Sequence, residues 1–182
     1  QIPEPAYTEK KTSAAVEDHL KQMGLEVRTG IARYGVVGLL GTGRPGPTLM
    51  IRADMDALPV EEQTGLPFSS THAGAMHACG HDAHMAMVLG AAQVLSSVKD
   101  TLKGNLKFIF QPAEEGPGGA KPMIEEGVMD NPKVGYAVGC HLWPASPEGT
   151  IGVKAGTIMA AMNRFDIRII GSQGHGAMPH LC

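Results

Sequence analysis

Short apolar segments alternate with segments of helical periodicity along most of the chain, and this alternation constrains the possible fold more than any other feature. Four apolar runs bounded by turn residues are typical of strands: residues 36–40, 48–53, 106–110 and 134–140. Three segments have the spacing of helices: residues 12–23, a segment from about Asp82 to residue 95, and residues 121–126. Strands that alternate with helices predict an α/β fold with a mostly parallel sheet flanked by helices.

The pattern changes after about residue 155. Phe165, Ile167 and Ile169 alternate with polar residues, which is typical of a half-buried antiparallel strand. We therefore predict two domains, with residues 1–155 as the N-terminal part of the first and residues 156–182 as the beginning of the second. The second domain would contain only one strand and one loop, so we expect the chain to be incomplete.

Charge and cysteine content narrow the class of protein. The net charge of −3 provides no basic surface, so we expect no nucleic-acid partner. No apolar run approaches the roughly 20 residues that span a bilayer, and no export signal is visible, so we expect no membrane partner. Three cysteines are an odd number for a disulfide framework and favour a reducing compartment, the cytoplasm. There are 8 histidines, several of them beside Gly, Cys or acidic residues, which directs attention to metal binding.

The strongest local motif is His-Ala-Cys-Gly-His-Asp at residues 77–82. In an extended segment, side chains two residues apart project to the same side, so Cys79 and His81 can reach one metal ion. Gly80 between them removes a side chain that would crowd the ion. A thiolate with an imidazole favours zinc or a similar metal over magnesium or calcium. The alternative is a buried cysteine beside a histidine that caps the following helix, and this pair alone does not decide between the two.

Two adjacent glutamates, Glu114 and Glu115, follow the apolar run 106–110. In an extended loop, neighbouring side chains point in opposite directions, so one carboxylate can bind metal while the other faces the water. A free carboxylate can take a proton from a water whose pKa a metal has lowered to about 7. The alternative is a solvated acidic turn, but the apolar strand before the pair and the flanking proline and glycine residues favour a shaped loop.

His141 follows the apolar run 134–140, which we expect to be a buried strand. A lone histidine in that position is more often a core residue with satisfied hydrogen bonds than a metal ligand, and the position alone leaves both interpretations open. Cys140 is interpreted as an unreactive core thiol whose side chain points away from the side that His141 faces.

Other residues are weaker candidates. His84 lies three residues after His81, which allows helical metal spacing, but we favour a residue that lines the pocket. His19 is expected on the surface, and Arg52 is expected to support the fold. Two histidines in loops support the site or have no role: His72 and His77. Three carboxylates can orient ligand imidazoles by accepting their second N–H: Asp54, Asp56 and Asp82.

Four motifs occur in order along the chain: Ile-Arg-Ala-Asp-Met-Asp-Ala-Leu-Pro at 51–59, and the segments 76–84, 110–116 and 139–144. Together they resemble the dinuclear-metal amidohydrolases, the family of hippurate hydrolase, aminoacylases and the hydrolases of indole-acetyl amino acid conjugates. The resemblance implies a zinc-peptidase-like catalytic domain with four metal ligands: Cys79, His81, Glu115 and His141. It also implies that Cys79 bridges two ions, and that Glu114 is the general base that activates water and then protonates the leaving amine.

Residues 171–180, Gly-Ser-Gln-Gly-His-Gly-Ala-Met-Pro-His, are similar to the family's motif in its smaller α+β dimerisation or lid domain. The resemblance implies that His175 stabilises the oxyanion, often in the partner subunit's site, and that the protein is a homodimer through this domain. Without the resemblance, a glycine-rich turn that shapes a strand connection would be preferred. Family members are longer and carry a further ligand histidine near their C-terminus, so we expect this chain alone to be inactive.

The resemblance implies a metal-dependent hydrolase that cuts the amide bond of N-acyl amino acids. The substrate would be a small molecule, and the cofactors would be two divalent ions, zinc, manganese, nickel or cobalt. An aminopeptidase or dipeptidase on the same scaffold is the alternative enzyme. A non-catalytic metal-binding or dimerisation module is the alternative from another class, although a structural site would have no use for the spare base Glu114. A cysteine hydrolase built on Cys79 is the least favoured.

Overall fold

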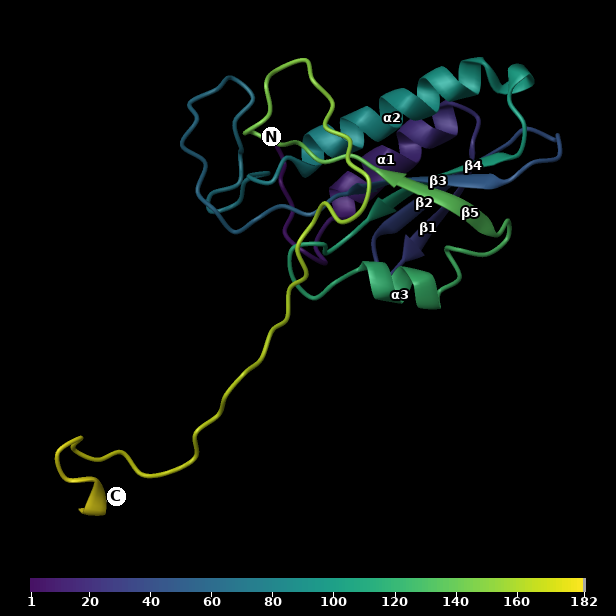
Figure 1. Ribbon diagram of the computed structural model, residues 1–182. Helices are drawn as coiled ribbons and strands as arrows, with labels where there is room; N and C mark the ends of the chain where they lie inside the picture. Colours follow the sequence, from purple (N-terminus) through teal and green to yellow (C-terminus); the bar gives the residue numbers. More distant parts are fainter. Residues whose placement is uncertain (182) are drawn as a thin grey trace. The chain divides into compact units, whose positions relative to one another are not determined.

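The computed structural model describes residues 1–181 and contains a five-stranded sheet with helices (Figure 1). The main elements are α1 (Lys10–Gln22), β1 (Glu26–Ile31), β2 (Gly35–Gly41), β3 (Thr48–Asp54), α2 (His81–Ser97), β4 (Asn105–Gln111), α3 (Ala120–Glu125) and β5 (Val134–Gly139). Two short 3-10 helices are η1 (Lys99–Thr101) and η2 (Pro179–Leu181). The three expected helices and the first four expected strands form close to their expected limits. β1 was not expected, because its sequence lacks an apolar run and most of its side chains are exposed.

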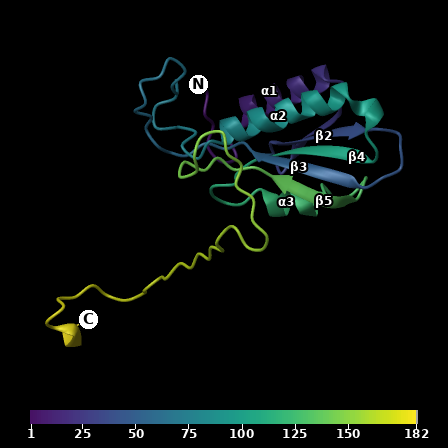
Figure 2. The same ribbon diagram turned by 45° about the horizontal axis from the view of Figure 1, so that its top comes forward.

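The strand order in the sheet is β1-β2-β4-β3-β5. β4, β3 and β5 run parallel to one another, whereas β1 and β2 are antiparallel to their neighbours. The α/β prediction is therefore confirmed, with a mixed sheet whose parallel half contains the three strands that precede the candidate residues (Figure 2). Because the carboxyl ends of parallel strands meet at one edge, this topology brings those residues together.

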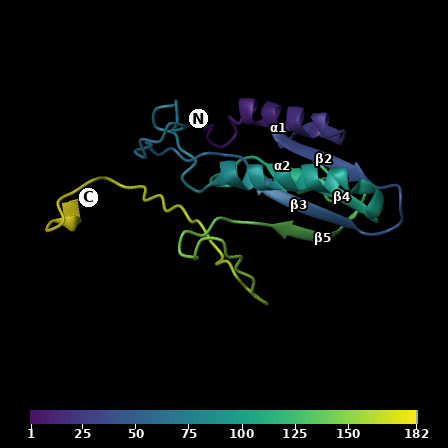
Figure 3. The same ribbon diagram turned by 90° about the horizontal axis from the view of Figure 1, so that it is seen from above.

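α1 and α2 lie side by side on one face of the sheet (Figure 3). Their apolar residues form one core with the central strand β4: Val16 and Leu20 of α1, Met85, Val88 and Ala92 of α2, and Phe108 and Phe110 of β4. The apolar stripe expected on α2 is confirmed, since Leu89 and Leu95 pack against the same core. Burial of each large side chain stabilises the fold by about 1.5–3 kcal/mol. The core therefore fixes the first turn of α2 at the carboxyl edge of the sheet.

The strand β5 is not buried as expected. It pairs with β3 alone, and five of its six residues are exposed, among them Tyr136 and Val138. Its position at the sheet edge explains this, because no second strand of residues 1–181 covers its outer side. Cys140, which follows β5, is exposed as well, so the expectation of a core thiol is wrong.

The chain divides into two compact units, residues 1–143 and a second unit that begins at Pro144. In the second unit, the strand expected around Phe165 does not form, and Phe165, Ile167 and Ile169 are exposed. No strand within the described part of the chain pairs with this segment, so its alternating apolar side chains have no surface to cover. The expected domain limits at residues 155 and 156 stay a prediction. Among the helices of residues 1–181, none has the length and hydrophobicity that crossing a bilayer requires.

Candidate metal centre

The residues expected to carry chemistry lie at the carboxyl edge of the parallel strands. Each follows a strand or begins a helix: Asp54 and Asp56 at the end of β3, His81 at the start of α2, Glu114 and Glu115 after β4, and His141 after β5. Four segments that are distant in the sequence thus supply one cluster of side chains. The sheet topology, rather than local sequence, brings them together.

His81 lies at the centre of this cluster. Its side chain is buried, and its Nδ1 lies 3.3 Å from Oδ1 of Asp56. Its Nε2 lies 3.6 Å from Oδ2 of Asp54, 3.7 Å from Oε1 of Glu115 and 3.9 Å from Oε2 of Glu114. Neither ring nitrogen forms a hydrogen bond with any group of residues 1–181. A buried imidazole with two unpaired nitrogens is uncommon in a folded protein, and a bound cation would satisfy Nε2.

The four predicted metal ligands come together around His81. One ligand atom each from Cys79, His81 and Glu115 lies within 4.8 Å of the others. The fourth residue joins them through the 3.5 Å contact between Sγ of Cys79 and Nε2 of His141. The roles of these residues as ligands stay a prediction, but their convergence is a property of the fold.

The backbone that brings Cys79 and His81 together is not extended, so the expected geometry is wrong. Cys79 lies in a turn, His81 is the first residue of α2, and Gly80 between them has a φ of +86°. A side chain is strained in this left-handed conformation. A Cβ at Gly80 would also lie 2.8 Å from Cδ1 of Leu142. The glycine therefore makes room for the segment that carries His141, rather than for an ion.

The loop that carries Glu114 and Glu115 is also not extended. Residues 114–117 form a turn, and both carboxylates face the same imidazole nitrogen of His81 instead of pointing in opposite directions. The two carboxylates differ in exposure, with the Glu114 side chain 41% exposed and the Glu115 side chain 25% exposed. Glu114 is thus the carboxylate that water reaches more easily.

Negative charge is crowded in this cluster. Burial and then the charges of Glu115 and Asp54 raise the pKa of Glu114. Burial and Glu115 raise the pKa of the Cys79 thiol to about 12. A divalent cation bound among these groups would favour their ionised forms. The unpaired nitrogens of His81 and the mixture of S, N and O donors therefore fit a metal ion of the zinc type.

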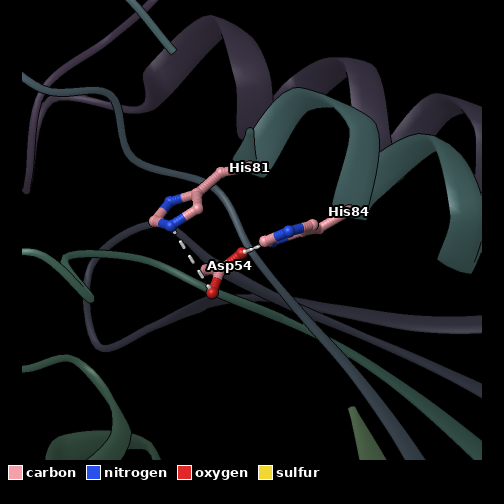
Figure 4. Close-up of side chains that lie close together, drawn as sticks. All are labelled: Asp54, His81 and His84. Carbon is pink, nitrogen blue, oxygen red and sulfur yellow. Dashed lines mark hydrogen bonds and ion pairs between the residues drawn. The ribbon is translucent and has the colours of Figure 1, made fainter. Parts of the chain in front are cut away.

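Two buried aspartates contact imidazoles of the cluster, Asp56 at His81 and Asp54 at His84; their expected role in orienting ligand imidazoles stays a prediction. Asp56 lies against Nδ1 of His81, and its Oδ2 accepts the N–H of Glu115 at 2.9 Å. Burial alone would raise the pKa of Asp56, but His81 and backbone N–H groups outweigh it and lower the pKa. Asp54 accepts a hydrogen bond from His84 at 2.7 Å (Figure 4). Together they fix the ring of His81 between two carboxylates.

Arg52 links the ends of β3 and β4, which agrees with its expected role in supporting the fold. It donates to Oδ2 of Asp54 at 2.6 Å and to Oε1 of Gln111 at 2.8 and 3.0 Å. Burial raises the pKa of Asp54, but Arg52 and the histidines outweigh that effect and lower the pKa.

The third aspartate, Asp82, does not contact the imidazoles of the cluster. Asp82 is exposed and accepts the N–H of Ala83, so its expected contact with a ligand imidazole is wrong.

Both ring nitrogens of His84 form hydrogen bonds. Asp54, His81 and His84 do offer ligand atoms within 4.8 Å of one another. However, Nδ1 of His84 bonds to Asp54, and its Nε2 accepts the N–H of Leu142 at 2.9 Å. Because its one lone pair already accepts an N–H, this arrangement favours the expected residue that lines the pocket over a metal ligand.

Glu9 is a residue of the site that sequence patterns missed. Its side chain is buried, and its Oε1 accepts the N–H of Ala113 at 2.8 Å, across 104 residues of chain. Ala113 has a φ of +52° and directly precedes Glu114. Glu4 is buried in the same way and accepts the N–H groups of Lys11 and Thr12, which caps α1. An acidic residue before a helix is a common capping signal, but nothing local distinguishes the contact of Glu9.

The remaining histidines lie outside the cluster. His19 is exposed, as expected, and Nδ1 of His72 bonds to the carbonyl oxygen of Pro3 at 3.0 Å. His77 is half-buried, and burial lowers its pKa. His175 lies in the second unit, where its Nδ1 accepts the N–H of Ala177 at 3.1 Å. Its role at the oxyanion stays a prediction.

Comparison with known proteins identifies relatives along the whole chain. Residues 50–179 match the sequence model of the peptidase family M20/M25/M40. The chain is 48% identical to thermostable carboxypeptidase 1 of Saccharolobus solfataricus, over 99% of the chain and 46% of that relative. It is 46% identical to an N-acyl-L-amino acid amidohydrolase of Geobacillus stearothermophilus, over 98% of the chain and 48% of the relative. It is 44% identical to N-acetyl-L-cysteine deacetylase of Bacillus subtilis, over 99% of the chain and 43% of that relative.

A solved structure has the same fold. The crystal structure of the Bacillus subtilis protein YXEP, described as a dinuclear metal binding peptidase from the M20 family, superposes with a TM-score of 0.79 and 42% identity. The match covers 84% of this chain and 42% of that one. The chain thus spans about half the length of the relatives it matches.

Proposed function

The chain belongs to the peptidase family M20/M25/M40, and we propose that the whole protein that contains it hydrolyses the amide bond of N-acyl amino acids. One observation carries the proposal. The buried His81 has an unpaired Nε2 close to the carboxylates of Glu114 and Glu115, and the thiol of Cys79 lies in the same cluster; the proposal takes Glu115 as a ligand and leaves Glu114 unbound. A hydrolase needs that spare carboxylate, whereas a structural metal site does not.

Four residues would hold the metal ions: Cys79, His81, Glu115 and His141. Two divalent ions, zinc, manganese, nickel or cobalt, would fit these donors. When bound, the metals lower the pKa of a water and polarise the substrate carbonyl. Asp54 and Asp56 then hold the ring of His81 in place.

Glu114 is the proton carrier in this proposal. Its carboxylate accepts a proton from the attacking water and returns it to the nitrogen of the departing amino acid. Burial and the neighbouring Glu115 raise its pKa toward the working range of an acid–base catalyst. Its greater exposure leaves it on the side from which water and substrate arrive. His175 would donate a hydrogen bond to the oxyanion, from the second domain of a partner subunit.

The substrate class follows from the relatives and from the chemistry. Three of them are named as an amidohydrolase, a deacetylase and a carboxypeptidase. An N-acyl amino acid and the C-terminal end of a peptide share an amide bond whose leaving group is an amino acid with a free carboxylate. We therefore propose a substrate of this type. A homodimer formed through the second domain and a cytoplasmic location belong to the same proposal; light scattering and cell fractionation test them.

The decisive experiment replaces Glu114 by Gln in the whole protein. We expect kcat on N-acetyl amino acids to fall by about 10²–10⁴ with metal content unchanged, because the variant keeps the ligands and loses the base. The matched control is Glu125→Gln, an exposed glutamate on α3 whose replacement should leave kcat unchanged. Full activity of the Glu114 variant, or full activity after exhaustive chelation, would contradict the proposal. Faster turnover of free-amine dipeptides than of N-acetyl substrates would favour an aminopeptidase.

A further inference from the structure

His84 lies one helical turn after His81, and its side chain is 1% exposed. Its two nitrogens bond to two different parts of the chain. Nε2 receives the backbone N–H of Leu142 at 2.9 Å. Because an N–H can only donate, Nε2 carries a lone pair, and the ring proton of a neutral imidazole lies on Nδ1. Nδ1 then donates this proton to Asp54 at 2.7 Å (Figure 4).

The peptide that His84 holds is adjacent to His141. Nδ1 of His141 lies 2.6 Å from the carbonyl oxygen of Leu142, and a carbonyl can only accept. The proton of His141 therefore lies on Nδ1, which leaves a lone pair on its Nε2. That nitrogen lies 3.5 Å from Sγ of Cys79. Thus the carbonyl oxygen of Leu142 leaves Nε2 of His141 free for a metal ion, and the N–H of the same residue is bound by His84.

Few other contacts hold this segment. β5 is an exposed edge strand, and residues 140–143 beyond it are exposed. Leu142 packs closely against Gly80, at the start of α2, and the ring of His141 lies edge-on to His84 with 4.6 Å between ring centroids. The hydrogen bond from Leu142 to His84 is its one directional link to the rigid helix α2 in the described part of the chain.

We propose that His84 is a positioning residue for His141, acting through the backbone N–H of Leu142. This inference rests on the proposed function only in taking His141 as a metal ligand. A rival mechanism runs through Asp54, whose Oδ2 lies 3.6 Å from Nε2 of His81. The two mechanisms differ in which nitrogen of His84 matters. Gln places its terminal oxygen close to the position of Nε2, whereas Asn places its terminal amide close to the position of Nδ1.

The test measures Zn²⁺ affinity by competition with a chromophoric chelator, using the whole protein prepared without metal. We expect His84→Asn to weaken binding by about 10–100-fold, the usual effect of losing a residue that supports a ligand, and His84→Gln to restore most of it. In a His141→Ala background, His84→Asn should cause no further loss, because the ligand it positions is already gone.

Three results separate the possibilities. If His84→Asn binds Zn²⁺ as tightly as the unchanged protein, or if its loss persists in full beside His141→Ala, the inference is wrong. If the unchanged protein binds none of Zn²⁺, Mn²⁺, Ni²⁺ and Co²⁺, the proposed function is wrong instead. Should the variants fail to fold, histidine-selective ¹⁵N NMR of the unchanged, metal-free protein decides. A proton on Nδ1 of His84 supports the inference, and a proton on Nε2 overturns it.

Discussion

Lys107 anchors the loop that leads into β5, and its replacement by Met should destabilise the fold. The side chain is 3% exposed in the middle of β4. Its Nζ donates to the carbonyl oxygens of Val128, Asp130 and Pro132 at 3.0, 2.7 and 2.9 Å. These residues directly precede β5, the edge strand that leads to His141. Removal of one ammonium group therefore removes three hydrogen bonds at once.

The size of the effect follows from the burial of the three acceptors. The bond to Val128 is buried, so its carbonyl would stay unpaired at a cost of about 1–3 kcal/mol. The bonds to Asp130 and Pro132 are partly buried, and water can replace them, so each loss is about 0.5–1.5 kcal/mol. Relief from burying an ammonium group offsets part of the sum. We expect a net loss of about 2–4 kcal/mol, a large part of the roughly 5–15 kcal/mol that stabilises a domain.

The assay is urea denaturation followed by circular dichroism, with Lys103→Met as the matched control. Lys103 is exposed, has no side-chain hydrogen bond or ion pair within residues 1–181, and lies four residues earlier in the chain. Its replacement should change the free energy of unfolding by less than about 0.5 kcal/mol. If both variants unfold at the same urea concentration as the unchanged chain, the three hydrogen bonds do not stabilise the loop, and the reasoning is refuted.

Three further predictions concern the site. Glu9→Ala leaves the N–H of Ala113 without its acceptor, so stability should fall by about 1–3 kcal/mol, and kcat of the whole protein should fall at unchanged metal content because the loop of Glu114 loses its support. Burial alone would raise the pKa of Asp54, but nearby cationic groups outweigh it and lower the pKa in the folded protein. The ionised carboxylate therefore stabilises the fold above about pH 4, and this contribution is lost as the pH falls through the folded-state pKa. In the Asp54→Asn variant, the urea midpoint should depend less on pH in that range. The pKa of Cys79 is raised to about 12, so Zn²⁺ binding near pH 7 should release its thiol proton; calorimetry in two buffers should show about one proton fewer released by Cys79→Asp.

The order of strands and helices was predictable because each element carries its own periodic pattern. The stripe that begins at Met85 and the apolar run that ends at Phe110 form the helix and strand that their spacing indicates. β1 was missed because it lies at the sheet edge with exposed side chains, which removes the apolar pattern. β5 was identified as a strand but not as an exposed one, since its apolar residues are the same whether or not a neighbour covers them.

The convergence of Cys79 and His81 was predicted for the wrong geometric reason. Extended and left-handed backbones both bring the two side chains to one point, and the sequence Cys-Gly-His permits either. In the structure Gly80 takes the left-handed form, and a methyl group of Leu142, 62 positions further on, lies 2.8 Å from where a Cβ would stand. A contact of that range leaves no trace in the local pattern.

The expected ligands can be recognised from the local sequence, whereas the residues that hold the site in position can be identified only from long-range contacts. A ligand can be recognised by its chemistry, because few side chains bind metal and they cluster near strand ends. Glu9 and His84 bind backbone N–H groups 104 and 58 residues away, and every residue type except proline offers an N–H there. Local sequence therefore indicates which side chains could meet a metal ion, whereas only the folded chain identifies the buried carboxylate and imidazole that hold them in position. Substitutions at such residues should weaken metal binding or turnover without removing any ligand. From the sequence alone, these substitutions would be classified as changes of surface residues far from the site.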